Sequence, residues 1–448
     1  MKRAFTAVIA TVIIVGILLA GFLILKQDSP KKSPDAYVGI EYTGDSVEDG
    51  KALIDKVKGY TNLFVLASGL LQRDFESVNE LGDYAVDAGM YFLPYFGNYI
   101  QATFSSWLES AKERWGDHFL GVYYSDEPGG KMLDDYVQFE DISTGDSITK
   151  TRYGDVFVEK ENGVQINYEF EGSVRLYEPS RDGEFNYEAI FYPNGTITVV
   201  NAAPNGFSYD SYEELQSVRP FKDFDDTYER FVDRTKSNIE YLKNNTRVFT
   251  SDYDLQWFDY LSGYDVVLAQ IGWNLTFNQQ IAQIRGAAQL QNKEWGITIT
   301  WNNQSPPYLA NGTEILSQMK SAYECGAQYL VVFDYYTNDS SAYGTMLDEH
   351  FEALQKFWND VVTNPDEAKG SSQADSAIVF PHNYGWGARW MEDKIWGIFK
   401  ADDRTKQMWT IMQVALQEHG LNLDIVYADS NYPLPSKYQN IYNCSNLE

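Results

Sequence analysis

Short, almost continuously apolar runs recur along the chain and alternate with amphipathic stretches. Eight such runs occur: Tyr37–Tyr42, Asn62–Ser68, Tyr91–Gly97, Phe119–Tyr124, Arg247–Ser251, Asp265–Gly272, Trp295–Trp301 and Tyr329–Tyr335. Stretches with helical periodicity separate them, such as Ser46–Lys58, Asn79–Ala88, Phe104–Trp115, Phe277–Gln291 and Glu314–Cys325. Parallel strands that are covered on both faces have this apolar character. The pattern predicts an α/β fold, a (β/α)8 barrel over residues 36–361, in preference to an open doubly wound sheet.

The spacing breaks once, between the fourth and fifth runs. Four segments there alternate polar and apolar residues: Gly154–Val158, Val164–Glu169, Tyr187–Tyr192 and Thr196–Val200. Asn-Gly and Asp-Gly turn sequences separate them, which predicts antiparallel hairpins in an insertion over residues 140–205. The helix that follows the fourth strand is then expected at Phe224–Leu242. The insertion should lie beside the barrel mouth, as a lid, a sugar-binding module or an exposed appendage.

The N-terminal residues predict a membrane anchor. No charge interrupts Ala4–Leu25, and a helix of that length spans about 33 Å, enough to cross a bilayer core. A cleavable signal peptide has a shorter apolar region and a small-residue cleavage site, and Phe22–Lys26 offers no such site. We therefore predict a transmembrane helix within residues 1–26 and a polar stalk over residues 27–35.

The orientation of this anchor depends on glycosylation signals, because basic residues flank both sides of the apolar run. N-glycosylation sequons begin at Asn194, Asn244, Asn274, Asn303, Asn311, Asn338 and Asn443. They favour a single-pass protein of the cell membrane whose body is extracytoplasmic.

Beyond a linker at residues 362–374, the chain predicts a second, smaller domain over residues 375–448. A strand at Ser376–Pro381, a helix at Thr405–His419 and a strand at Asp424–Tyr427 form a βαβ unit. A third strand-like run, Tyr438–Tyr442, follows. This is a partial α/β domain.

Composition excludes several classes of partner. The net charge of −29 repels phosphates, so we expect no nucleic acid partner. The two cysteines and four histidines are scattered singly, so they predict no metal site, and nothing in the sequence points to a cofactor. Aromatic residues make up 15% of the chain, which suits either the stacking of sugar rings or the filling of a large core. The oligomeric state stays open.

Acids and aromatic residues stand at the ends of the predicted barrel strands, where barrel enzymes carry their catalytic groups. The catalytic candidates are Asp126 and Glu127, because the fourth strand leads through them into the helix breaker Pro128. The candidate substrate-binding residues are Glu41, Asp252, Asp254, Trp273, Trp301, Asp334 and Tyr335. Cleavage of a glycosidic bond needs a carboxylic acid to protonate the leaving oxygen and a second group to stabilise an oxocarbenium-like centre. The inventory therefore favours a glycoside hydrolase with a glycan substrate.

Each candidate also has a purely structural alternative. Asp126 or Glu127 could cap the next segment or pair with Lys131. Glu41 could be an ordinary strand-end ion-pair partner, and Asp252 and Asp254 could cap a loop turn. The two tryptophans could be core residues instead of sugar platforms.

The Asp126-Glu127-Pro128 sequence resembles the strand-4 acid motif of (β/α)8 glycoside hydrolases. The large retaining clan has its acid/base glutamate there, usually as Asn-Glu-Pro. Hexosaminidase-like families have an Asp-Glu pair, in which the aspartate orients a substrate acetamido group. The resemblance implies that Glu127 is the general acid and Asp126 its helper. The tail from Ser376 to Tyr442 is similar to the first half of the trimerisation domain of some β-galactosidases.

The sequence departs from the retaining clan at the seventh strand. That clan has its nucleophilic glutamate at the end of this strand, whereas Trp295–Asn302 contains no acid there. Three alternatives follow: substrate assistance with Asp126, a different second acid such as Asp334 or Asp252, or a barrel that binds glycans without cleaving them. We expect a membrane-anchored glycoside hydrolase of cell-surface or environmental glycans. The alternative is a non-catalytic, glycan-binding or surface-layer-associated protein.

Overall fold

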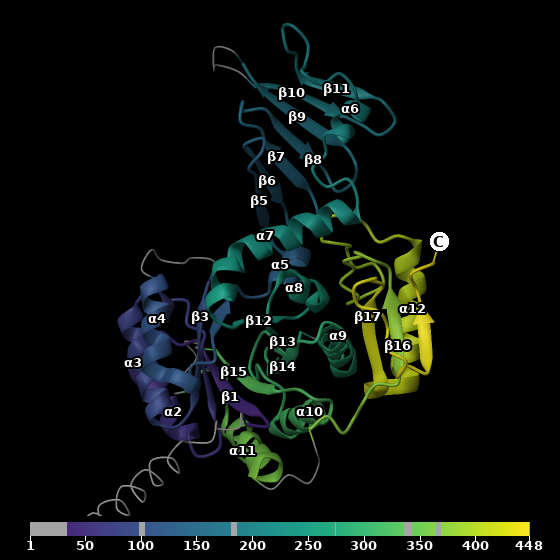
Figure 1. The fold of residues 1–448 in the computed structure, drawn as a ribbon. Helices are drawn as coiled ribbons and strands as arrows, with labels where there is room; N and C mark the ends of the chain where they lie inside the picture. The colour runs from purple at the N-terminus through teal and green to yellow at the C-terminus, as the bar shows by residue number, and fades with distance from the viewer. Residues whose placement is uncertain are drawn as a thin grey trace, which may run out of the picture. The chain divides into compact units, whose positions relative to one another are not determined.

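Eight parallel strands close into a barrel in the computed structural model, which describes residues 34–97, 104–180, 186–273, 275–335, 343–363 and 369–447 (Figure 1). The strands are β1 (Tyr37–Tyr42), β2 (Leu63–Leu66), β3 (Tyr91–Phe96), β4 (Val122–Tyr124), β12 (Val248–Asp252), β13 (Val266–Ile271), β14 (Glu294–Ile299) and β15 (Tyr329–Asp334). This confirms the predicted barrel. The strand β4 is shorter than the predicted Phe119–Tyr124 because Gly121, with φ of 139°, departs from strand conformation.

Helices follow the strands along the chain. They are α2 (Val47–Val57), α3 (Phe75–Asp87), α4 (Phe104–Trp115), α7 (Phe224–Asn245), α8 (Gln256–Ser262), α9 (Phe277–Leu290), α10 (Gly312–Glu324) and α11 (Asp348–Phe357). Side-chain oxygens of Ser46, Asp74, Asp223 and Asn311 accept backbone N–H groups of the first turns of four of them. The helix α3 begins earlier than the predicted Asn79 because Asp74 caps it.

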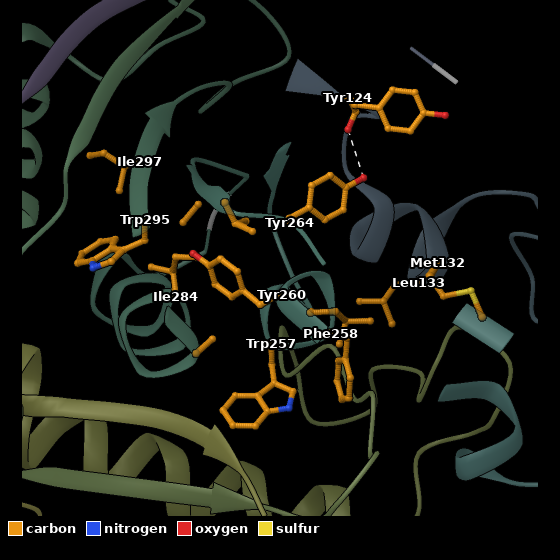
Figure 2. Close-up of a cluster of buried hydrophobic side chains, with 14 of the residues drawn as sticks. Tyr124, Met132, Leu133, Trp257, Phe258, Tyr260, Tyr264, Ile284, Trp295 and Ile297 are labelled. Carbon is orange, nitrogen blue, oxygen red and sulfur yellow. Dashed lines mark hydrogen bonds between the residues drawn. The ribbon is translucent and has the colours of Figure 1, made fainter. Parts of the chain in front are cut away.

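Two layers of apolar side chains hold the barrel. One fills its interior and includes Tyr37, Leu93, Phe249 and Tyr329. The other lies outside, between strands and helices. Figure 2 shows the part of this outer layer that α8 contributes, where the Tyr264 hydroxyl donates to the Tyr124 carbonyl at 3.2 Å. This bond ties the end of β4 to the segment after α8.

The insertion after β4 contains more strands than the four segments that the sequence pattern singled out. It begins with the short helix α5 (Pro128–Asp134) and then forms a seven-stranded antiparallel sheet in the order of the chain. The strands are β5 (Val137–Asp141), β6 (Asp146–Lys150), β7 (Val156–Glu159), β8 (Gln165–Tyr168), β9 (Val174–Pro179), β10 (Asn186–Phe191) and β11 (Ile197–Asn201), followed by α6 (Tyr212–Ser217). At its base the Arg234 guanidinium lies 4.7 Å from the ring centroid of Phe139, so α7 supports β5.

The C-terminal part forms a parallel sheet of three strands in the order β17-β16-β18. Its elements are β16 (Ser376–Phe380), α12 (Asp403–His419), β17 (Leu423–Tyr427) and β18 (Asn440–Asn443). The predicted strand–helix–strand order is present, and the strand-like run after it forms β18. The similarity of this tail to a trimerisation domain stays a prediction.

A fully buried ion pair joins this sheet to the barrel helix α9. The Nε atom of Arg285 lies 2.7 Å from Oδ1 of Asp424, and neither side chain is exposed to solvent. Arg285 also donates to the carbonyls of Leu421 and Leu423, and Tyr438 donates to the other carboxylate oxygen of Asp424. Because Nε and Nη2 of Arg285 and both carboxylate oxygens of Asp424 have hydrogen-bond partners, most of the cost of burying the two charges is offset.

No helix in the described ranges is both long enough and apolar enough to span a bilayer. The predicted anchor at Ala4–Leu25 lies outside those ranges, as do the sequon residues Asn274 and Asn338 and part of the predicted linker, residues 364–368.

Replacement of Arg285 by Met should lower the free energy of unfolding by about 3–5 kcal/mol, because Asp424 loses its buried partner and keeps only the partly exposed Lys437, 3.5 Å from Oδ2. Urea unfolding followed by circular dichroism measures this. A matched control is Lys400→Met, which breaks the exposed pair with Glu171 and should change the value by less than about 1 kcal/mol. Equal effects of the two substitutions would show that the buried ion pair contributes no more to stability than the exposed one.

Candidate active site

The turn after β4 carries the Asp-Glu pair in an unusual backbone conformation. Ser125 has φ of 53° and Glu127 has φ of 55°, although neither residue is glycine. Residues other than glycine seldom adopt this left-handed region, and each costs about 1–3 kcal/mol, which contacts with the surrounding structure must offset. Two such residues within three positions reverse the chain directly at the end of the strand. They place Asp126 and Glu127 at the C-terminal end of the barrel.

The neighbouring strand β12 holds this turn in place. Its last residue, Asp252, accepts the backbone N–H groups of Gly129 at 2.6 Å and Gly130 at 2.9 Å. The Ser251 carbonyl accepts the N–H of Glu127 at 2.9 Å. A Cβ atom at Gly129 would lie 2.7 Å from the Asp254 carbonyl oxygen, and one at Gly130 would lie inside contact distance of the Tyr253 ring. The two glycines after Pro128 therefore allow α5 to lie against β12.

Hydroxyl groups fix the carboxylate of Asp126. Tyr123 and Ser251 both donate to Oδ1 of Asp126, Ser251 at 3.1 Å. Gln270 of β13 donates to the Ser251 oxygen at 3.0 Å. The Lys131 ammonium lies 3.7 Å from the other carboxylate oxygen, Oδ2. Three barrel strands thus position this one group.

Glu127 is a carboxylic acid at neutral pH. Burial is the largest cause, the negative charge of Asp126 the next, and together they raise its pKa to about 8. The nearby Lys131, 3.8 Å from Glu127 Oε2, and a hydrogen bond with Gln270 oppose this rise. A carboxyl group that keeps its proton near pH 7 can serve as a general acid.

Glu41, at the end of β1, is also protonated at neutral pH. Burial and then the charge of Asp126 raise its pKa to about 8, against a hydrogen bond from Thr298 that lowers it. The Thr298 hydroxyl donates to Oε2 of Glu41 at 3.0 Å. The charge of Asp126 thus contributes to the raised pKa of both Glu41 and Glu127.

Two cavities lie against this pair. Asp126 lines the first, of about 490 Å³, together with Glu41, Tyr95, Tyr123 and Tyr335. Trp301 supports that wall, since its ring centroid lies 5.0 Å from that of Tyr335. Glu127 lines the second, of about 550 Å³, whose other residues are Asp134, Tyr253, Trp273, Leu275, Arg389 and Trp390. Glu127 lines one cavity and Asp126 lines the other. This arrangement suits the cleavage of a bond between two groups that occupy the two cavities.

Three of the predicted substrate-binding carboxylates line neither of these two cavities, and their role in substrate binding stays a prediction. Asp252 holds the α5 amides, as described above. Asp254 is buried, accepts the N–H of Leu255 at 2.8 Å and lies 4.0 Å from the Arg389 guanidinium. Burial raises the pKa of Asp334 to about 7, and backbone N–H groups of Met346 and Thr345 oppose this rise. The physical reason is that strand ends also fasten loops, so an acid there need not face the mouth.

Several contributors are missing from the sequence prediction. Tyr123 and Ser251 lie within the predicted strand runs and were not singled out as site residues, although both contact Asp126. Arg389 and Trp390 come from the loop between β16 and α12. This loop is far along the chain from Asp126 and Glu127, so nothing in the sequence indicates that it reaches the site. Within the described ranges, no group of three or more His, Cys, Asp or Glu residues could hold a metal ion.

Comparison with known proteins identifies no family. No family model matches the chain, and no curated protein matches it. Among solved structures, the chain is similar to the crystal structure of GH5_18 from Streptomyces cattleya in complex with GlcNAc, with a TM-score of 0.46 and 10% identity over 92% of this chain and 99% of that one. It is also similar to a mutant O-GlcNAc hydrolase from Thermobaculum terrenum, with a TM-score of 0.25 and 9% identity over 72% of this chain and 54% of that one. These values are too low to assign a function.

Proposed function

We propose that this protein is a glycoside hydrolase in which Glu127 is the general acid. The observation that carries the proposal is a half-buried carboxyl with a raised pKa, Glu127, which lines one cavity at the barrel mouth while the adjacent Asp126 lines the other. Glu127 would donate its proton to the glycosidic oxygen as the bond from that oxygen to the anomeric carbon breaks. Water then supplies the hydroxyl group of the new reducing end and restores the proton.

Asp126 would stabilise the positive charge that develops on the sugar. It lines the cavity next to that of Glu127, and its orientation is fixed by Tyr123 and Ser251. Fixed donors around a catalytic group reduce the reorganisation that the transition state requires. Glu41, which holds a proton, would bind a sugar hydroxyl in this cavity.

The finer proposal is substrate assistance. The strand β14 ends in Thr298 and Ile299, without an acid, and the carboxyl of Glu41 is uncharged and therefore a weak nucleophile. An acetamido oxygen of the substrate would attack the anomeric carbon, and Asp126 would orient it and stabilise the resulting oxazolinium. This is favoured over a second carboxylate because Asp252 and Asp334 line neither cavity.

The substitution Glu127→Gln should lower the turnover of natural glycosides by about 10²–10⁴-fold, because the general acid is lost. Sugar binding should be retained, since the amide has almost the shape of the acid. The measurement is hydrolysis of a panel of aryl glycosides and polysaccharides, with Glu171→Gln, an exposed glutamate of the insertion, as the control. Unchanged turnover would remove Glu127 from the mechanism.

The pH profile provides a second readout of the same group. Because the acid form of Glu127 is the active one, kcat/KM should fall as pH rises through about 8. The residual activity of the Glu127→Gln variant should lack this basic limb. A basic limb that persists in the variant would assign it to another group.

Substrate assistance predicts a strict preference for 2-acetamido sugars. Only these sugars supply the attacking oxygen, so N-acetylhexosaminides should be cleaved while plain glucosides and galactosides are not. Thiazoline analogues of the oxazolinium should inhibit tightly because they resemble the transition state. Efficient cleavage of a glycoside without the acetamido group would contradict this mechanism but not the proposed hydrolase. Binding of glycans without cleavage of any would favour the non-catalytic alternative.

We also propose that an N-terminal helix anchors the protein in the cell membrane with the barrel outside. The sequon asparagines within the described ranges, Asn194, Asn244, Asn303, Asn311 and Asn443, are all exposed, which supports an outward-facing body. Protease added to intact cells should release the barrel, whereas a cytoplasmic protein of the same cells stays intact. A fully protected chain, or a secreted form that lacks residues 1–26, would contradict the proposal.

A further inference from the structure

Two exposed tryptophans meet at the cavity of the general acid. Of the eleven tryptophans in the chain, Trp273 and Trp390 are the two exposed ones within the described ranges, with 42% and 50% of their surface accessible. They come from the loop after β13 and from the C-terminal part of the chain, yet both line the cavity of Glu127. Exposed indole faces are costly in water, and their convergence at one cavity indicates a ligand ring with apolar faces.

Trp273 is tied to the catalytic pair by a short chain of hydrogen bonds. Its indole N–H donates to the Gln270 side-chain oxygen at 3.1 Å, and the Gln270 nitrogen donates to Ser251 at 3.0 Å. Ser251 in turn donates to Asp126. The indole N–H is therefore used within the protein, and the ring itself is left for a ligand.

The side chain of Trp390 packs against Arg389, whose guanidinium forms ion pairs with two aspartates. The Arg389 guanidinium lies 4.5 Å from the ring centroid of Trp390. Arg389 donates to both carboxylate oxygens of Asp134, at the end of α5, and at 2.7 Å to Oδ2 of Asp393. The neighbouring carbonyl of Ala388 accepts a bond of 2.8 Å from Gln279 of α9. The C-terminal loop is thus fastened to the barrel on both sides of the cavity.

The charge of this cavity selects against anions. Arg389 is the one cationic residue among the described residues that line this cavity. It already forms ion pairs with Asp134, Asp393 and Asp254. An anionic ligand would find no unpaired positive charge and would meet Asp134. A neutral ring with polar edges and apolar faces fits the site, which is the chemistry of an uncharged pyranose.

We infer that the cavity of Trp273 and Trp390 is a leaving-group subsite for a neutral pyranose, completed by the C-terminal part of the chain. The inference rests on the proposed function, because the role of Glu127 as general acid decides which of the two sugars at the scissile bond lies in this cavity. A general acid protonates the leaving oxygen, so the sugar that departs lies in the cavity that this acid lines. The sugar that keeps its anomeric carbon in the reaction then lies in the cavity of Asp126 and Glu41. The protein would prefer oligosaccharides to glycosides with a small leaving group.

The test compares two substrates with the same reacting sugar. One is a neutral disaccharide or trisaccharide that the full chain hydrolyses, and the other is the corresponding glycosyl fluoride, whose leaving group is too small to reach the indoles. The substitution Trp390→Ala should lower kcat/KM for the oligosaccharide by about tenfold, from lost stacking, and leave that for the fluoride within about twofold, since only the leaving-group contact changes. Trp409→Phe, in α12 and outside the cavity lining, is the control.

Equal losses on both substrates, or no loss on either, would overturn the inference. Circular dichroism and the midpoint of urea unfolding confirm that each variant folds like the parent. An oligosaccharide with a glucuronate as its leaving sugar should be a poor substrate for the parent, and efficient cleavage of it would contradict the neutral subsite.

A binding experiment separates this inference from the proposed hydrolase. Cellotriose and N,N′,N″-triacetylchitotriose are titrated against the parent and the Trp390→Ala and Trp409→Phe variants while tryptophan fluorescence is followed. If no glycoside is cleaved but binding of either trisaccharide weakens about tenfold in Trp390→Ala alone, the sugar site stands and the hydrolase fails. Absence of binding to the parent, or binding that does not depend on Trp390, overturns the subsite.

Discussion

The contact on which the candidate site depends is the bond of Asp252 to two backbone amides. Its carboxylate accepts the N–H groups of Gly129 and Gly130, the first amides of α5 after Pro128. A negative group at a helix start is electrostatically favourable, and proline needs no partner for its nitrogen. The bond draws α5 against β12 and forces the chain between β4 and α5 into a tight reversal. Asp126 and Glu127 occupy this reversal, so their placement is set by the neighbouring strand rather than by their own.

A second set of contacts brings the C-terminal part of the chain into the same site. The buried Arg285–Asp424 pair fixes the three-stranded sheet on α9, and Gly286 allows the close approach because a Cβ there would lie 2.7 Å from the Ile425 carbonyl oxygen. Arg389 then links the loop after β16 to the end of α5. The helix α5 is therefore held by β12 at one end and by the C-terminal loop at the other. The cavity of Glu127 is thereby lined by barrel residues and by Arg389 and Trp390 of the C-terminal loop.

The sequence predicted the barrel because its signal is periodic and local. The eight apolar runs and the helical stretches between them can be recognised from the pattern of side chains alone. The Asp-Glu-Pro sequence likewise marks a strand end without knowledge of tertiary structure. Which strand-end acids face the mouth could not be predicted, because Asp126 and Asp252 occur in similar local contexts. Their uses differ through partners more than a hundred residues away, such as Gly129 for Asp252 and Ser251 for Asp126. Trp390 was missed for the same reason, since only the folded chain brings it to Trp273 and Glu127.

The protonated acids have a consequence for stability that follows from their burial. Glu41 and Glu127 have their pKa raised from 4.5 to about 8 in the folded chain. In the unfolded chain they would release their protons as pH rises above about 4.5, whereas the folded chain retains them up to about 8. Between these values the folded state binds more protons than the unfolded state, so the free energy of unfolding falls as pH rises. The carboxyl groups of Glu41 and Glu127 lie near that of Asp126, and such a cluster lowers stability at neutral pH. Their placement here opposes folding at neutral pH and is offset by the two apolar layers of the barrel, which is the arrangement expected where buried acids serve chemistry rather than structure.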